Sequence, residues 1–200
     1  MTDPDRNVGS GDSKHTESAW EDRALLEGVR RRDPAALGRF FDVAFPHVYS
    51  IAFRLTGDHH AAEDVAQDVF LKVHRAADRL DVDRNPRPWL TTITYNACRD
   101  AARRVSARPE YAVDATVIGE RHESKETPEG TVLSEERSRL VERALRALDE
   151  ESRAVVILHD YCDVPHQEIA AIVNSSHAAV RKRYSRALER MAEFLRGLKQ

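Results

Sequence analysis

Cysteine is scarce in this chain, which contains only two among its 200 residues, Cys98 and Cys162. The two lie far apart and provide neither a disulfide framework nor the paired spacing of a zinc site, which is typical of a protein from a reducing compartment. The first 18 residues contain no apolar core of the kind found in signal peptides. No apolar run approaches the length needed to span a membrane. The sequence therefore predicts a cytoplasmic protein with no membrane insertion.

Enzyme motifs are missing as well. The chain has no phosphate-binding glycine loop and no nucleophile motif. Two clusters of potential metal ligands have suggestive spacing: His59, His60, Glu63 and Asp64 in one, and His159, Cys162 and His166 in the other. Neither cluster completes a ligand set, so both are better explained as the polar ends of helices. The sequence thus disfavours an enzyme, and we expect no catalytic residue, no metal site and no cofactor.

Alternation of apolar and polar residues, which marks a half-buried strand, occurs nowhere over a useful length. Hydrophobic residues make up 41% of the chain, enough for helical cores despite 32% charged residues. Helical periodicity begins near Trp20, stops near Arg104 and resumes at Ser134-Glu135. Caps and first-turn prolines mark helix starts at Asp33-Pro34, Asp58, Pro88 and Asp149.

The sequence therefore predicts an all-α fold of two small helical domains joined by a flexible linker. Residues 1–18 are polar and rich in Gly, Ser and Asp, which is typical of a disordered tail. Residues 19–104 form the first helical domain. Residues 105–134 contain Pro, Gly and acids without sustained periodicity, which is typical of a linker. Residues 135–200 form the second domain, which contains a helix-turn-helix.

The helix-turn-helix is the strongest motif and occupies residues 164–190. A short amphipathic run over residues 167–173 meets the polar break Asn174-Ser175-Ser176, and a basic amphipathic run follows at once. This pattern predicts that the second helix enters the major groove of DNA. Asn174 tolerates a left-handed backbone, and Ser176 can cap the second helix, whose free N–H groups suit a phosphate. The candidate DNA contacts of this domain are Ser176, His177, Arg181, Lys182, Arg183 and Arg186.

Aromatic, amide and guanidinium side chains share one face of the predicted helix 89–104, opposite its apolar face. Arginines neutralise phosphates, and Tyr and Trp can stack on exposed bases. The alternative is an ordinary helix end whose arginines complement the macrodipole. The candidate contacts to opened DNA are Trp89, Tyr95, Asn96, Arg99, Arg103 and Arg104.

On the helix that begins after Asp58, Leu71 shares a face with acidic residues. Asp64, Gln67, Asp68 and Leu71 lie together opposite the apolar face of this helix. A solvated acidic face is the ordinary explanation, and a single exposed leucine means little alone. With its flanking carboxylates, Leu71 could instead be a docking spot for a basic partner helix.

Three segments, in order, resemble parts of one protein family. Residues 61–75, AAEDVAQDVFLKVHR, resemble the helix with which bacterial sigma factors bind core RNA polymerase. Residues 88–104, PWLTTITYNACRDAARR, resemble the helix that melts the promoter and reads its minus-ten element. Residues 148–191 resemble the domain that reads the minus-thirty-five element. Since only a short linker separates the two domains, the chain resembles the extracytoplasmic-function (ECF) class of the sigma-70 family.

The resemblance implies a sigma factor that binds core RNA polymerase, directs it to specific promoters and helps to open the DNA. The acidic face around Leu71 would dock on the clamp helices of the polymerase β′ subunit. Helix 89–104 would hold the opened minus-ten strand, and the helix-turn-helix would bind the minus-thirty-five duplex. The implied partners also include the β subunit, promoter DNA and an anti-sigma factor.

The chain departs from the family pattern at several positions. Asp149 follows Leu148 where the family usually has Pro, and Asn174 stands where Gly is usual. Ala179 and Lys182 replace the common Thr and Ser of the recognition helix. The fold stays credible with these changes, but the minus-thirty-five sequence that this chain prefers is left open.

The main alternative is a helix-turn-helix transcriptional regulator that acts without polymerase. Such a regulator accounts for the C-terminal half of the chain but gives no purpose to the acidic face around Leu71 or to helix 89–104. Regulators of this kind also usually dimerise, and the chain shows no coiled-coil heptad run.

Overall fold

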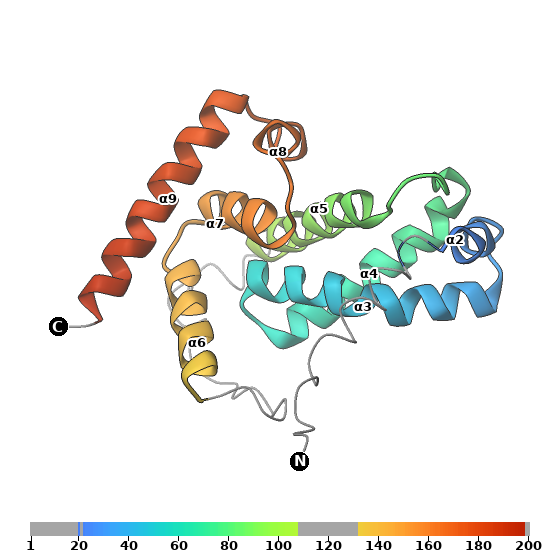
Figure 1. Cartoon of the computed structure of the whole chain (residues 1–200), viewed down its shortest axis with the longest axis horizontal. Coiled ribbons are helices and arrows are strands. Elements are labelled where there is room, and N and C mark those ends of the chain that lie inside the picture. Colours follow the sequence, from blue (N-terminus) through green and yellow to red (C-terminus); the bar gives the residue numbers. More distant parts are fainter. Residues whose placement is uncertain (1–19, 21, 108–131, 199–200) are drawn as a thin grey trace, which may run out of the picture.

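The computed structural model describes residue 20 and residues 22–107 and 132–198, and every regular element in these ranges is a helix. The first group comprises α2 (Arg23–Arg30), α3 (Pro34–Thr56), α4 (His59–Ala76), the 3-10 turn η1 (Ala77–Arg79) and α5 (Arg87–Ser106). The second group comprises α6 (Val132–Arg146), α7 (Glu150–Val156), the π-helical η3 (Ile157–Tyr161), α8 (His166–Ile172) and α9 (His177–Gly197) (Figure 1). The expected all-α fold is confirmed. The expected tail and most of the expected linker lie outside the described residues.

Local caps start the helices where the sequence predicts. The carboxylates of Asp33, Asp58 and Asp149 each accept a hydrogen bond from the backbone N–H three residues on, at 2.8, 2.8 and 2.9 Å. The hydroxyl of Ser176 does the same for α9, at 3.2 Å from the nitrogen of Ala179. Each bond satisfies a donor that the first helical turn leaves free and contributes about 1 kcal/mol.

The two groups of helices are the two predicted helical domains, and they touch. In the first domain, α3 packs against α2, α4 and α5. In the second, α7 and α8 pack against α9. Across the domains, α3 also contacts α7 and η3, so the buried apolar residues form one continuous cluster. Its largest fully buried side chains include Leu26, Phe40, Ile51, Leu90, Leu145, Ile157, Leu158 and Ile169.

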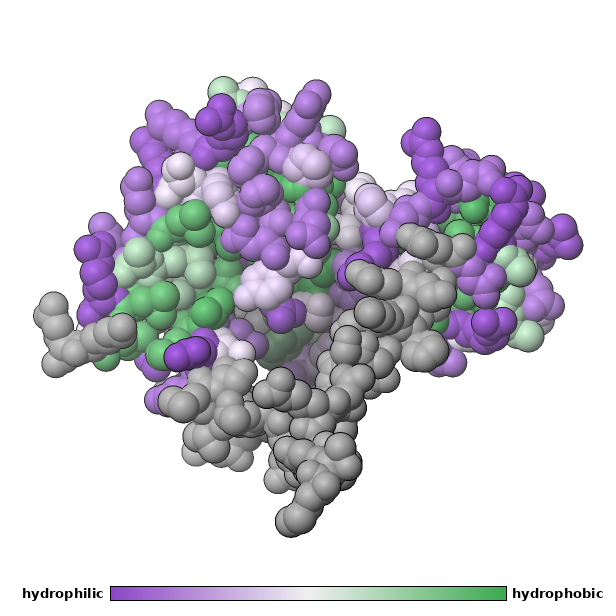
Figure 2. Space-filling model, in the orientation of Figure 1, coloured by the Kyte–Doolittle hydropathy of each residue, from purple (hydrophilic) through white to green (hydrophobic). Residues whose placement is uncertain are grey.

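Hydrophilic side chains cover most of the visible face, but apolar ones gather over α6 and α9 (Figure 2). On α9, Leu188 is 40% exposed. Val141 of α6 and Met191 of α9 are only half-buried against the core. This apolar face is therefore available for a protein contact. Within the described ranges, no helix combines the length and the apolar character that crossing a membrane requires.

Gly28 allows α2 to lie close against α3. A Cβ atom at this position would lie 2.5 Å from the Cβ of Ala36, which is closer than two carbon atoms pack. Gly38, on α3, is exposed and has open space around its Cα. The two glycines therefore serve different purposes in otherwise similar helical backbones.

The substitution Gly28→Ala should lower the free energy of unfolding by about 1–3 kcal/mol, because overpacking outweighs the gain in helix propensity. Gly38→Ala is the matched control and should raise that free energy by about 1 kcal/mol. Urea unfolding followed by circular dichroism measures both changes. Equal effects at the two positions would show that α2 and α3 are not this close.

His47 connects α3 to α5. Its Nε2 atom lies 3.0 Å from the hydroxyl oxygen of Thr91, and its ring meets Trp20 edge-on. Burial, helped by the nearby Arg87 guanidinium, lowers the pKa of His47 from 6.5 to about 4. The folded protein therefore holds this imidazole neutral at pH values where an unfolded chain protonates it.

The free energy of unfolding should consequently fall as the pH drops from about 6.5 to about 4, because His47 is protonated in the unfolded state but stays neutral in the folded state. The loss reaches about 3 kcal/mol at most. Urea midpoints measured across this window for wild type and His47→Gln test the effect. The variant should show a flatter pH profile, and parallel profiles would assign the pH dependence to another group.

Candidate nucleic-acid and protein interfaces

The acidic face of α4 is open to solvent. Asp64 and Gln67 are exposed, and Leu71 is 49% exposed. Asp68 lies on the same face, and its carboxylate accepts a hydrogen bond from Arg104 of α5 at 2.9 Å. The structure thus brings the four predicted polymerase contacts together. It also adds a link to α5 that the sequence pattern does not reveal.

An apolar groove beside this face escaped the sequence analysis. The groove has a volume of about 430 Å³ and lies between α3 and α4, with Gln67 and Leu71 among its lining residues. Phe41 is 42% exposed, and its ring centroid lies 4.5 Å from that of Phe70 and 5.3 Å from that of Phe45. In the sequence, the adjacent pair Phe40-Phe41 could have indicated an exposed aromatic surface on this helix. Neighbours on a helix point about 100° apart, so both cannot face the centre of the core.

The predicted DNA face of α5 is only partly exposed. Arg103 and Arg104 are exposed, whereas Trp89, Asn96 and Arg99 are half-buried. Trp89 packs against the core. The guanidinium groups near the end of the helix are therefore its most accessible cationic groups.

Tyr95 differs from its expected placement on the exposed face of this helix, because its side chain is only 9% exposed. Burial raises the pKa of Tyr95, Arg99 opposes the shift, and the carboxylates of Glu150 and Glu151 add to it. These acids belong to α7, far along the chain. Periodicity within α5 could not reveal a cover that comes from another domain.

The amino-terminal part of α9 carries most of the predicted duplex contacts. Asn174 adopts a positive φ of 52°, so the left-handed turn before the helix is confirmed. After the Ser176 cap, His177, Arg181, Lys182 and Arg186 are exposed. One predicted contact is engaged elsewhere, since the guanidinium of Arg183 pairs with the carboxylate of Glu151.

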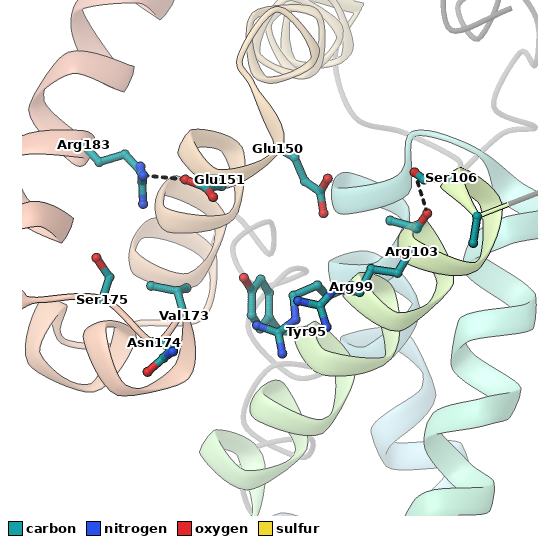
Figure 3. Close-up of a pocket in the computed structure, with 12 residues that line it drawn as sticks. Tyr95, Arg99, Arg103, Ser106, Glu150, Glu151, Val173, Asn174, Ser175 and Arg183 are labelled. Atoms are coloured by element: carbon teal, nitrogen blue, oxygen red, sulfur yellow. Dashed lines mark hydrogen bonds and ion pairs between the residues drawn. The ribbon is translucent and has the colours of Figure 1, made fainter. Parts of the chain in front are cut away.

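A cleft of about 750 Å³ separates α5 from the helix-turn-helix domain (Figure 3). Tyr95, Arg99 and Arg103 line it from α5, and Glu150 and Glu151 line it from α7, with Glu151 directed at Arg183. The far wall consists of the turn residues Asn174 and Ser175 together with Arg183. The structure therefore places members of both predicted DNA-binding sets around one cleft.

Three histidines of the two possible metal clusters take part in ring packing. The rings of His159 and His166 stack with centroids 4.1 Å apart, and Tyr184 meets both edge-on. His59 stacks on Phe53 at 4.3 Å. Among the residues that the structure describes, no group of three His, Cys, Asp or Glu side chains is placed to hold a metal ion.

Two family models match the chain. The model described as Sigma-70 region 2 matches residues 41–108, and the model described as Sigma-70, region 4, matches residues 138–191. The first match covers α4 and α5, and the second covers most of the helix-turn-helix domain.

Two curated relatives match over nearly their whole length. The ECF RNA polymerase sigma factor SigW of Bacillus subtilis is 28% identical over 181 residues, which are 86% of this chain and 96% of the relative. The ECF RNA polymerase sigma-E factor of Escherichia coli K12 is 32% identical over 177 residues, which are 84% and 91% of the two chains.

Among solved structures, CnrH in complex with the cytosolic domain of CnrY matches with a TM-score of 0.61 at 24% identity, covering 88% of this chain and 98% of that chain. The sigma factor RpoE of Bartonella quintana, in complex with the anti-sigma factor NepR, matches with a TM-score of 0.58 at 23% identity, covering 80% and 96%. These two similarities support the fold.

Proposed function

The chain belongs to the extracytoplasmic-function class of the sigma-70 family, and we propose that its three charged helical faces divide promoter recognition between them. As a member of this family, it binds core RNA polymerase, directs the enzyme to specific promoters and supports the initiation of transcription. This membership sets aside a regulator that acts without polymerase.

The polymerase docks on the acidic face of α4 and on the adjoining aromatic groove. The observation that carries this proposal is the exposure of Leu71 and Phe41 beside the exposed carboxylate of Asp64. Apolar side chains rimmed by carboxylates suit a helix that presents apolar and basic residues. The clamp helices of the β′ subunit, which the family resemblance implies, are the proposed occupant.

The two DNA faces act on different states of the promoter. On α5, Trp89, Tyr95, Asn96, Arg99, Arg103 and Arg104 hold the opened minus-ten strand. On α9, Ser176, His177, Arg181, Lys182, Arg183 and Arg186 bind the minus-thirty-five duplex. The capped amino end of α9 supports the second assignment, since its free N–H groups and clustered cations suit phosphates.

Further partners follow from the family. The apolar face over α6 and α9, around Leu188, has the exposed apolar surface that a second protein contact requires. We assign this contact to the polymerase β subunit. An anti-sigma factor is a further expected partner, as NepR is for the RpoE structure. The family is one of transcription initiation factors. The chain thus acts in the cytoplasm beside its polymerase, without a catalytic residue or cofactor of its own.

The substitution Asp64→Arg should weaken binding to core polymerase at least about tenfold, because it places a cation against a basic partner helix. Asp64 is exposed and pairs with no described side chain, so the helical circular-dichroism signal should persist. Glu168→Arg makes the same change of charge at an exposed position of α8 and serves as the control. Fluorescence titration of labelled chain with core polymerase, without DNA, gives both affinities. Unchanged affinity for Asp64→Arg would reject this docking face.

The substitution Arg181→Ala should weaken promoter binding by about 1–3 kcal/mol if the guanidinium reads a base. The loss would then depend on the minus-thirty-five sequence, whereas a phosphate contact would weaken all promoters alike. Arg196→Ala is the control on the same helix, 15 residues and about 22 Å farther along. Holoenzyme binding to promoter fragments measures the effect, and equal binding by wild type and Arg181→Ala would remove this residue from the interface.

A further inference from the structure

The turn between α2 and α3 places an arginine where many helices have a glycine. Arg32 adopts a φ of 60°, in the left-handed region. Its N–H donates to the carbonyl oxygen of Val29 at 2.9 Å, and the N–H of Asp33 donates to that of Gly28 at 3.0 Å. These two bonds close a helix end around a left-handed residue, which is usually glycine because a Cβ atom there costs free energy. An arginine at this position therefore needs a compensating contact.

The guanidinium of Arg32 provides that contact at the end of α4. Its Nε atom donates to the carbonyl oxygen of His74 at 3.1 Å, and its Nη2 atom donates to that of Arg75 at 3.1 Å and to the carboxylate of Asp78 at 3.3 Å. The last carbonyls of a helix have no partner within it. A planar guanidinium serves several acceptors in fixed directions, whereas the ammonium of lysine has no such fixed geometry. Arg32 thus fixes where α4 ends and where η1 begins.

A second arginine of α2 holds the segment that follows η1. Residues 80–86 lead from η1 to α5, and α2 contacts η1 at this end of the first domain (Figure 1). The guanidinium of Arg23 pairs with the carboxylate of Asp83 in this segment. The side chain of Asn85 accepts a hydrogen bond from the backbone N–H of Arg87, the first residue of α5, at 2.9 Å. Helix α2 and its turn therefore hold the chain from the end of α4 to the start of α5.

This segment sets the position of the proposed DNA face of α5. Trp89 lies in the first turn of α5, directly after the segment, and packs against the core. A binding face must keep its side chains within about 0.5 Å of their binding geometry, and it depends on neighbouring contacts to do so. Neither Arg23 nor Arg32 falls within residues 41–108, which the Sigma-70 region 2 model matches. The two arginines are thus a feature of this chain that the family match does not include.

We propose that Arg32, assisted by Arg23, is a positioning residue for the opened minus-ten strand: it holds the passage from α4 to α5 so that α5 presents its DNA face, and it does not touch the DNA. The inference rests on the proposed role of α5. Asp64 and Leu71 lie before the end of α4 that Arg32 holds, within a helix that α3 and α5 pack against. Loss of the Arg32 contacts should therefore reduce promoter opening and spare binding to core polymerase.

Arg32→Gly tests the proposal in the full chain, because glycine adopts the left-handed turn without a side chain. Holoenzyme with this variant should open about fivefold less promoter DNA than wild type, whereas its affinity for core polymerase should stay within about twofold. Permanganate reactivity of unpaired thymines measures opening on a promoter that the wild-type holoenzyme opens, and fluorescence titration measures core binding. Arg30→Gln removes a positive charge from an exposed position of α2 and should change neither quantity.

Arg32→Lys separates positioning from a direct contact with DNA. Lysine keeps the positive charge but not the planar set of donors, so this variant should open as little promoter as Arg32→Gly. Hydrogen exchange of the amides in residues 77–86 should be about fivefold faster in both variants, while the amides of α9 should exchange as in wild type. Arg23→Gln should show the same two changes to a smaller degree, because its pair with Asp83 holds the segment at one point only.

The outcomes distinguish this inference from the proposed function. Full opening by Arg32→Gly overturns the positioning role, and restored opening by Arg32→Lys overturns it in favour of a direct phosphate contact. An equal loss of core binding and opening in Arg32→Gly shows a general structural role and also overturns the inference. Arg103→Ala tests α5 directly. If Arg103→Ala opens the promoter as wild type does, the proposed role of α5 fails, whereas reduced opening by Arg103→Ala without reduced opening by Arg32→Gly overturns only the positioning role.

Discussion

Four backbone carbonyls at the ends of two helices accept hydrogen bonds from the guanidinium of Arg153, and the relation between the two domains depends on this contact. Burial lowers the pKa of Arg153 from its usual value, but a guanidinium stays charged in a protein. Its desolvation is therefore a cost that only complete hydrogen bonding offsets. The contact is favourable only when the ends of α3 and α6 both lie within hydrogen-bonding distance of Arg153. It is therefore specific for one arrangement of the two domains.

Charge pairing explains how a chain with net charge -3 can present cationic surfaces to DNA. Arg104 is paired with Asp68, and Arg183 with Glu151, at positions that stay partly solvated. Ion pairs of this kind contribute about 0–1 kcal/mol, so phosphates can displace the carboxylates at little cost. The cations near the start of α9, such as Arg181 and Lys182, are exposed to solvent. Under the proposed function, the acids near these arginines would compete only weakly with DNA phosphates.

Most of the fold and part of the candidate site could be predicted from the chain. The acidic face of α4 and the basic start of α9 lie where helical periodicity places them, because both faces belong to single helices. The aromatic groove at Phe41 could not be located in that way, since its second wall is α4. Tyr95 was assigned to an exposed face for the same reason, because α7 covers it from another domain.

The sequence by itself determined where α3, α4, α7 and α9 begin, since the caps at Asp33, Asp58, Asp149 and Ser176 are bonds between residues three apart. It also determined which residues share a helical face, and the residues on those faces indicated the protein family. Only the tertiary structure decided that the two domains lie against each other, with Tyr95 covered and Leu71 free. The contact from Arg153 to Leu55 spans 98 positions, and no local pattern encodes which distant carbonyls a guanidinium will reach.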